Sequence, residues 1–246
     1  MHRFFINSDL IKGKEISIEN PTSHQIKNVL RMNEGDYFEL FNNTGNSYKA
    51  KIINCEANLI KCLIEDQLKT IQDGIEINVY QSIIKISKLE LIVDKLTEIG
   101  ISSFTPIVTE RTQKKDIDSL SENKLKRLKK ISIESSEQSG KVYIPIISSI
   151  KRLRNLDIGS PDNLDIVFYE NYEYAKKLNY LKNQFSDKKS ISVFIGPVGG
   201  FSIKEIEYFR SKESIVINLG NTIFKSDTAS IISVALLRNL ISGNLD

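Results

Sequence analysis

Near the carboxyl end of this 246-residue chain, two strand-like runs each break into a glycine-bearing turn and then into a helix-like stretch. The first segment spans residues 191–208 and turns at residues 196–202. The second spans residues 215–237 and turns at residues 219–229. In an open α/β sheet, ligands bind outside the carboxyl ends of the strands, where backbone N–H groups and helix N-termini converge. We therefore expect the functional site at these two turns.

The first turn contains Gly196, Gly199 and Gly200, which allow the backbone to approach a ligand closely. Their spacing matches neither G-x-G-x-x-G nor G-x-x-x-x-G-K-[ST], so it supports neither a dinucleotide site nor a P-loop. Ser202 and Glu205 then fit a capping box that opens a helix. By itself, the pattern fits a tight strand-to-helix connection as well as it fits a binding site.

The second turn carries two apolar residues, Ile223 and Phe224, at positions where loops are usually polar. These side chains either fold back on the core or form the wall of a pocket. Ser226 or Asp227 is expected to cap the helix that follows. Together, the two turns could hold a flat heteroaromatic group between apolar contacts and backbone polar groups.

Composition places the chain among ordinary globular proteins, with 40% hydrophobic and 26% charged residues. The net charge of +3 is compatible with a nucleic-acid partner without requiring one. Two cysteines without a CxxC spacing, and only two histidines, make a zinc site improbable, so we expect no metal. The amino terminus does not resemble a signal peptide and no apolar run reaches ~20 residues, so a cytoplasmic location without a membrane anchor is expected.

The first quarter of the chain is rich in strand patterns. Residues 36–41, 48–53 and 59–65 are predicted strands, and residues 42–46 form a hairpin turn between the first two. Residues 66–74 are polar enough for a domain boundary. We therefore predict a small β-rich domain over residues 1–72.

Beyond this boundary, strands alternate with helical patterns, which is typical of βαβ units and a largely parallel sheet. A capping box at residues 87–90 predicts a helix that Gly100 ends, and residues 101–108 follow as a strand. A long helix is predicted from about Glu122 to Ser139, with Gly140 as its stop, and residues 165–169 form a further strand. Residues 73–246 are thus predicted to form an α/β domain.

Several segments, in this order along the chain, resemble the bacterial 16S ribosomal RNA uridine-N3 methyltransferases of the SPOUT superfamily. The matching segments are residues 24–31, 34–36, 95–100, 110–111, 134–140, 196–201 and 219–229. The resemblance covers nearly the whole chain. It implies a PUA-like β-barrel that binds RNA, followed by an α/β methyltransferase domain tied in a trefoil knot.

The resemblance also implies S-adenosylmethionine as the cofactor, 16S ribosomal RNA of the small ribosomal subunit as the partner, and a homodimer. The residues expected to bind the cofactor are Tyr169, Glu170, Ile195, Gly196, Gly199, Gly200, Leu219, Gly220, Ile223, Phe224, Thr228 and Ala229. Those expected to bind RNA are Arg3, Lys27, Arg31, Lys85, Lys88 and Lys141. In this architecture, phosphate contacts make RNA affinity dependent on salt.

The chain departs from the family pattern at a few positions. Val198 stands where the family usually has Glu, which removes a carboxylate. Lys225 replaces an Arg and Asp227 replaces a Glu, and lysine lacks the bidentate fork of arginine.

Uridine N3 carries a proton at neutral pH, so it must lose that proton before or during attack on a methyl group. Lys225 or Arg111 is expected to stabilise the negative charge that develops on the base. Asp227 is expected either to position the loop or to take the proton, with the alternative that it only caps the helix.

The sequence therefore predicts an S-adenosylmethionine-dependent methyltransferase that modifies N3 of a uridine in 16S ribosomal RNA. One alternative is a SPOUT methyltransferase that acts on another RNA position, such as a ribose 2′-hydroxyl. Another is a ribosome-assembly factor that binds RNA without catalysis. A nucleotide-dependent oxidoreductase is more remote, because neither dinucleotide fingerprint is present.

Overall fold

The computed structural model describes residues 1–56, 58–69 and 74–243. Packing of the α-carbons divides the chain into two compact units. Unit 1 contains residues 1–72 together with residues 136–144, and unit 2 contains residues 73–135 and 145–246. The predicted boundary at residues 72 and 73 stays a prediction, since residues 70–73 lie outside the described residues.

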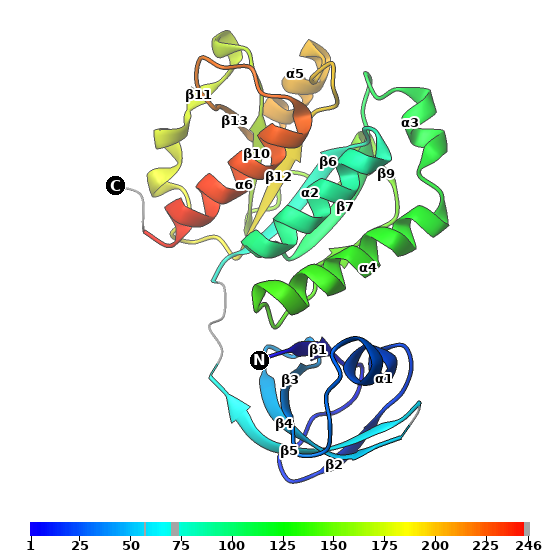
Figure 1. Cartoon of the computed structure of the whole chain (residues 1–246). Coiled ribbons are helices and arrows are strands. Elements are labelled where there is room, and N and C mark those ends of the chain that lie inside the picture. The colour runs from blue at the N-terminus through cyan, green and yellow to red at the C-terminus, as the bar shows by residue number, and fades with distance from the viewer. Residues whose placement is uncertain (57, 70–73, 244–246) are drawn as a thin grey trace. The chain divides into compact units, whose positions relative to one another are not determined.

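Unit 1 is a curled five-stranded sheet with a short helical segment (Figure 1). Its strands, in the order β1-β3-β4-β5-β2, are β1 Arg3–Phe5, β2 Glu15–Ile18, β3 Tyr37–Phe41, β4 Ser47–Cys55 and β5 Ile60–Leu68. The antiparallel hairpin between β3 and β4 confirms the predicted turn at residues 42–46. Helix α1 Thr22–His24 continues into η1 Gln25–Val29, which places Ile26 in a core with Phe4 and Phe38. The β-rich prediction for this part of the chain is confirmed.

Arg3 joins β1 to the segment 136–144 within unit 1. Its guanidinium pairs with Glu39 at 2.9 Å and donates to the carbonyl oxygens of Ser136 and Lys141 at 3.5 and 3.3 Å. The N–H of the neighbouring Phe5 donates to the Glu137 carboxylate at 2.9 Å. These bonds explain why residues distant in sequence belong to the small unit.

Unit 2 is built on an eight-stranded sheet in the order β11-β13-β10-β12-β6-β7-β8, with β9 paired to β7. Its strands are β6 Glu76–Ser82, β7 Ser103–Val108, β8 Ile146–Ile147, β9 Lys151–Arg152, β10 Asn163–Phe168, β11 Lys176–Lys177, β12 Ser190–Ile195 and β13 Ile215–Asn218. Every strand pair described in this sheet is parallel. The predicted α/β class with a parallel sheet is therefore confirmed. The implied knot stays a prediction, since strand order does not define threading.

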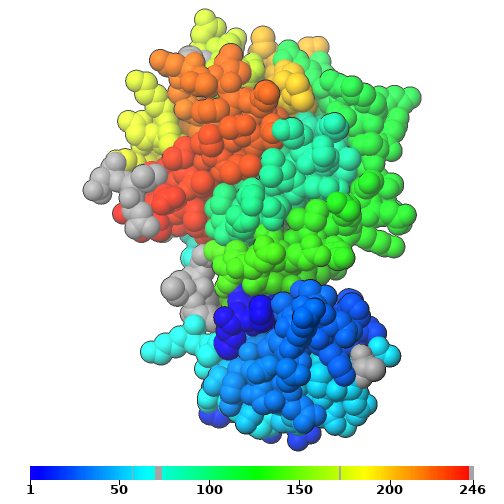
Figure 2. Space-filling model, viewed as in Figure 1, coloured from blue at the N-terminus to red at the C-terminus, as the bar shows by residue number. Residues whose placement is uncertain are grey.

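Helices pack against the sheet, and α2 lies beside α6 (Figures 1 and 2). The helical elements are α2 Ile86–Ile99, α3 Lys114–Ser119, α4 Glu122–Ser139, η2 Leu153–Asn155, η3 Tyr172–Tyr174, η4 Leu178–Asn183, α5 Ile203–Ser211 and α6 Ser226–Ile241. Leu89, Leu96 and Val234 join strand residues such as Val193 in the largest core cluster. Within the described residues, no helix is long and apolar enough to cross a membrane, and no cluster of acidic, histidine and cysteine side chains is suited to a metal.

The predicted helix ends were partly right. Gly100 and Gly140 end their helices with positive φ values of 100° and 80°, as expected. The capping box at residues 87–90 is wrong, because α2 begins at Ile86 with Lys85 as its N-cap, two residues earlier than a cap at Ser87 requires, and Glu90 pairs with Arg127. The capping box that opens α5 is confirmed below.

Candidate functional site

A pocket of about 220 Å³ opens at the carboxyl ends of three adjacent strands, β13, β10 and β12. Because these strands are parallel and neighbouring, the residues that follow each of them meet at one edge of the sheet. The pocket is lined by Phe168, Tyr169, Glu170, Ile195, Gly196, Pro197, Val198, Gly199, Gly200, Phe201, Asn218, Leu219, Gly220, Thr222, Ile223, Phe224, Ser226 and Ala229. The two turns singled out in the sequence thus form one cavity.

The lining contains every predicted cofactor residue except Thr228. It also contains residues that the sequence reasoning did not assign, namely Phe168, Pro197, Val198, Phe201, Asn218, Thr222 and Ser226. Most of these residues adjoin predicted ones in the same turns, so position at a strand end was the signal that could have found them. Val198 and Ile223 are 74% and 77% exposed, which places these apolar side chains at the mouth of the pocket rather than in the core.

The glycine-rich turn is folded too tightly for side chains at two of its positions. A Cβ on Gly196 would lie 3.1 Å from the backbone of Gly200 and Phe201. Gly200 has φ +67°, and a Cβ there would lie 2.7 Å from the Glu170 carboxylate. Glycine therefore lets the turn pass directly over the residues that follow β10.

Asn218 fastens the other turn to the end of β10. Its buried side-chain amide donates to the carbonyl oxygens of Tyr169 and Glu170 at 3.2 and 2.7 Å. Its side-chain oxygen accepts the Gly220 N–H at 2.7 Å. One side chain thus fixes the backbone on two sides of the pocket. Burial also raises the pKa of Tyr169, so this phenol keeps its proton at neutral pH.

Ser226 ties the two turns together. Its hydroxyl donates to the Gly196 carbonyl at 2.6 Å and accepts a hydrogen bond from the Gln81 amide at 3.0 Å. Gln81 is fully buried at the end of β6 and also donates to the Ser82 carbonyl. The shape of the pocket therefore depends on a buried chain of hydrogen bonds from β6 through α6 to the glycine turn.

Arg111 holds the glycine turn from the side of β7. Its guanidinium donates to the carbonyl oxygens of Gly199 and Phe201 at 2.8 and 3.3 Å. At the end of the same turn, Ser202 and Glu205 exchange both hydrogen bonds of the predicted capping box. The structure thus brings Arg111 to the predicted site, where it acts on the backbone of the turn.

Asp227 is held by an ion pair with Lys88 at 2.5 Å. The Lys88 hydrogen bond lowers the pKa of Asp227, so its carboxylate is a weak proton acceptor. The expected cap by Ser226 or Asp227 is wrong, because both lie inside α6 and Lys225 occupies the N-cap without a side-chain hydrogen bond. The Lys225 side chain is exposed and makes no hydrogen bond or salt bridge within the described part of the chain, while its backbone carbonyl accepts the Ala229 N–H at 2.8 Å.

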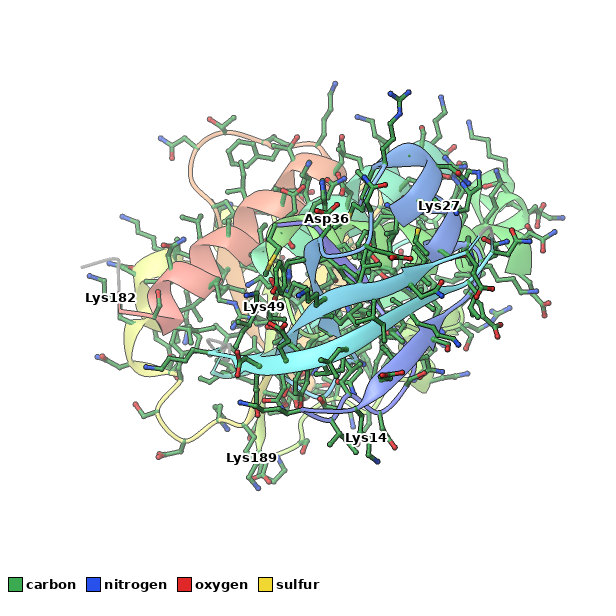
Figure 3. The ribbon with its side chains drawn as sticks, turned by 60° about the horizontal axis from the view of Figure 1, so that its bottom comes forward. Lys14, Lys27, Asp36, Lys49, Lys182 and Lys189 are labelled. Atoms are coloured by element: carbon green, nitrogen blue, oxygen red, sulfur yellow. The ribbon has the colours of Figure 1, made fainter. Side chains whose placement is uncertain are left out.

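The predicted RNA-binding residues fall in different surroundings in the two units. In unit 1, Lys27, labelled in Figure 3, donates to the Cys55 carbonyl at 2.9 Å and lines a shallow cleft with the exposed Arg31. Arg3 and the Lys141 backbone take part in the network described above, and Arg3 is largely buried. In unit 2, Lys85 is exposed beside the Lys88 pair.

The pocket suits a ligand with a flat aromatic part and polar, positively charged parts. Ile195, Leu219 and Phe224 supply apolar walls. The Glu170 carboxylate supplies an acceptor for hydroxyl or ammonium groups, and the crowded glycine turn presents backbone to the cavity. A nucleoside carrying a sulfonium and an amino-acid group has this combination of features.

Comparison with known families identifies this fold and pocket as those of an RNA methyltransferase. A family model described as an RNA methyltransferase domain matches residues 72–238, and one described as an RNA methyltransferase PUA domain matches residues 18–65. The chain belongs to the ribosomal RNA small subunit methyltransferase E family.

Curated relatives with that family name match over almost their whole length. The protein from Rickettsia conorii is 29% identical over 242 residues, covering 97% of this chain and 96% of the relative. The protein from Mesomycoplasma hyopneumoniae is 30% identical over 242 residues, covering 94% and 96%.

Solved structures share the fold. The ribosomal RNA small subunit methyltransferase E of Neisseria gonorrhoeae, solved bound to S-adenosyl methionine, has a TM-score of 0.87 at 24% identity and covers 98% of both chains. A Legionella pneumophila protein solved in complex with SAM has a TM-score of 0.83 at 24% identity and covers 96% of both chains.

Proposed function

We propose that this protein transfers a methyl group from S-adenosylmethionine to N3 of a uridine in 16S ribosomal RNA. The proposal rests on the observation that the turns after β12 and β13 together line one pocket, in a chain of this family. The names of the relatives point to RNA of the small ribosomal subunit as the substrate. The Neisseria structure was solved with S-adenosyl methionine bound.

The cofactor would supply an electrophilic methyl carbon, so the chain mainly has to orient the reactants and exclude water. Ile195, Leu219 and Phe224 would hold the aromatic part, and Glu170 would accept hydrogen bonds from its polar part. Ser226 and Asn218 keep the two turns in place before the ligand arrives. Less conformational entropy is then lost on binding.

Positive charge near the pocket would stabilise the uridine as it loses its N3 proton. Lys225 is the cation available to the substrate, because Arg111 already holds the glycine turn. Asp227 is a positioning residue, since its lowered pKa and its pair with Lys88 make it a poor base. Lys225 itself lies next to this carboxylate, which adds to the electrostatic field at the start of α6.

RNA would bind through cations of both units, with the partly buried Lys27 and the exposed Arg31 in the PUA-like unit and the exposed Lys85 at the start of α2. Lys141 belongs to the same proposal, whereas Arg3 and Lys88, also expected to contact RNA, are already paired with Glu39 and Asp227 and would act by holding the structure in place. Such phosphate contacts predict an affinity that falls steeply with salt. A substrate in the small ribosomal subunit would place the protein in the cytoplasm.

A homodimer is part of this proposal, and the surface of α6 supports it. Ile231, Ile232 and Leu236 on this helix are only partly buried, although all three are apolar. Apolar surface of this kind favours association between copies. Sedimentation equilibrium should give twice the chain mass of 28.0 kDa, and a single-chain mass would refute the dimer.

The proposal is tested by incubating the protein with radiolabelled S-adenosylmethionine and unmethylated small ribosomal subunits, with large subunits as the control. Label in small-subunit RNA alone is the expected result. Cofactor binding without transfer would favour another RNA position, such as a ribose 2′-hydroxyl of a different RNA. Absence of cofactor binding would favour a non-catalytic assembly factor.

A further inference from the structure

A second cleft, of about 650 Å³, lies in unit 2 beside the glycine-rich turn. Its walls come from the end of β7, from β9 with η2, and from the first two turns of α5. The side chains that matter for its chemistry are Arg152, Arg154, Lys204, Tyr208, Glu110 and Glu205. None of these residues was assigned to RNA binding by the sequence.

The pairing of short strand β9 brings the two arginines to this place. Arg152 pairs with Val108, the last residue of β7, so it stands at the same carboxyl edge of the sheet as the pocket. Leu153 follows it and is buried in the core, which leaves Arg152 and Arg154 exposed on either side. The buried Leu153 therefore fixes the position of Arg152 and Arg154, which form a basic wall of the cleft.

The carboxylates in the cleft are already engaged. The two Glu205 oxygens accept the backbone N–H groups of Glu110 and Ser202 at 2.8 and 2.9 Å. The Glu110 carboxylate accepts the Ser202 hydroxyl at 2.6 Å. These bonds hold both carboxylates at the turn.

The cations have no such partners. Within the described residues, the side chains of Arg152, Arg154 and Lys204 make no hydrogen bond or salt bridge. The cleft thus contains three free cations against two engaged carboxylates. An anion with several charged groups would complement this wall, and arginine forks match phosphate oxygens.

Tyr208 adds an aromatic group to the same cleft. It is half-buried on α5 against Phe209, with ring centroids 6.3 Å apart, and still lines the cavity. Cations that follow a backbone, combined with an aromatic ring for stacking, are typical of sites for single-stranded nucleic acid.

The cleft and the pocket share one structural element. Gly199 and Gly200 line the pocket, and Glu205, three residues beyond Ser202, lines the cleft. A strand held in the cleft therefore runs past the turn that shapes the pocket. We propose that this cleft binds the phosphate backbone of the RNA strand next to the nucleotide to be methylated, an inference that rests on the proposed function.

The test measures binding of the full-length protein to an unmethylated 16S ribosomal RNA transcript by filter retention over a range of salt. The variant is Arg152→Gln with Arg154→Gln, and Lys204→Gln is a second, independent variant. The control is Arg210→Gln with Lys212→Gln, which removes equal charge from exposed positions at the far end of α5. Calorimetry with S-adenosylmethionine reports whether the pocket is intact.

The double variant should bind RNA about tenfold more weakly. The slope of log Kd against the logarithm of the salt concentration should fall by about 1.4, the value for two lost single-strand contacts. The control and the affinity for S-adenosylmethionine should stay within about twofold of the unchanged protein. Equal losses in variant and control, or unchanged RNA binding, would overturn the proposal. The same assay is repeated with assembled small subunits: a loss seen with the subunits and not with the transcript would assign the cleft to a protein partner and also overturn the proposal.

This binding experiment is separate from methyl transfer. If the unchanged protein binds RNA through the cleft but transfers no methyl group to it, the proposed function fails while the cleft stands. If the unchanged protein transfers the methyl group and the double variant keeps full RNA affinity, the proposed RNA-binding role of the cleft is refuted while the proposed function stands.

Discussion

The Lys88 ammonium lies 2.5 Å from the Asp227 carboxylate, although the two residues are 139 positions apart in sequence. This pair joins the first turn of α2 to the first turn of α6, beside the pocket. Asp227 is largely buried, whereas Lys88 is half-exposed. The pair therefore fixes the start of α6 while its ammonium stays in contact with solvent.

Replacing either member of this pair should weaken the enzyme through the position of α6. Asp227→Asn and Lys88→Gln should each lower the free energy of unfolding by about 1 kcal/mol, the scale of a partly exposed ion pair. The double variant should be little worse than either single one, since both remove the same interaction. Chemical denaturation of the four proteins measures this coupling. Additive losses of unfolding free energy would show that the interaction between Lys88 and Asp227 contributes nothing to stability.

Methyl transfer should fall together with stability in these variants, with RNA affinity retained. Because the ammonium is already paired, Lys88→Gln should leave the salt dependence of RNA binding unchanged. Lys85→Gln, an exposed neighbour three residues earlier, is the matched comparison and should reduce it. If Lys88→Gln alone reduced the salt dependence of RNA binding, Lys88 would have to contact RNA directly.

Acid should remove the contribution of Asp227 selectively. Because Lys88 lowers the pKa of Asp227 in the folded protein, the pair stabilises the fold fully above the ordinary aspartate pKa. That stabilisation is lost as pH falls through the lowered, folded-state pKa. The difference in unfolding free energy between the unchanged protein and Asp227→Asn should be constant from about pH 7 to 5 and shrink below about pH 4. A difference that grows in acid would contradict the assignment.

Ser226→Ala should remove the hydrogen bond that holds the two turns of the pocket together. The change removes the donor to the Gly196 carbonyl and leaves the Gln81 amide without one of its partners. Loss of such a buried hydrogen bond costs about 1–3 kcal/mol. We expect reduced stability and about tenfold weaker binding of S-adenosylmethionine, measured by calorimetry.

Ser233→Ala is the control for this change, because it is the same substitution at a buried position of the same helix. The Ser233 hydroxyl bonds only to the Ser230 carbonyl of its own helix among the hydrogen bonds seen for it. Cofactor affinity should stay normal in this variant. Equal losses of affinity in both variants would argue against the role of Ser226.

Gly200→Ala tests the close approach of the turn to Glu170. The new Cβ would sit 2.7 Å from the carboxylate, at a φ of +67° that already disfavours alanine by about 1 kcal/mol. Gly35→Ala has a similar positive φ of +92° but open space around the new Cβ. Both variants should lose stability, and only Gly200→Ala should lose cofactor affinity. Normal affinity in Gly200→Ala would show that Glu170 does not shape the site.

Local patterns were enough to predict the longer regular elements and the location of the pocket. The capping box of Ser202 and Glu205 and the glycine stops at Gly100 and Gly140 involve bonds or backbone angles within a few residues. Such features can be predicted from neighbouring residues alone. The pocket followed because turns after adjacent parallel strands must meet at one edge.

Long-range bonds account for what the sequence did not reveal. Asn218 bonds to residues 48 and 49 positions away, and Ser226 reaches Gly196 only after the sheet has formed. The strand β9 is two residues long, so no alternation could indicate that it carries Arg152 to the sheet edge. The capping box at residues 87–90 was wrong because the helix starts earlier, with Lys85 at its N-cap, and Glu90 pairs with Arg127, 37 positions away in sequence.

The most direct measurement of the central claim identifies the methylated nucleoside. Small ribosomal subunits that lack the modification are incubated with the protein and radiolabelled S-adenosylmethionine, and their RNA is then digested to nucleosides. The account predicts that the label is recovered as N3-methyluridine, and that Ser226→Ala reduces its yield more than Ser233→Ala does. Label in a ribose-methylated nucleoside, or no label in a protein that binds the cofactor, would contradict it.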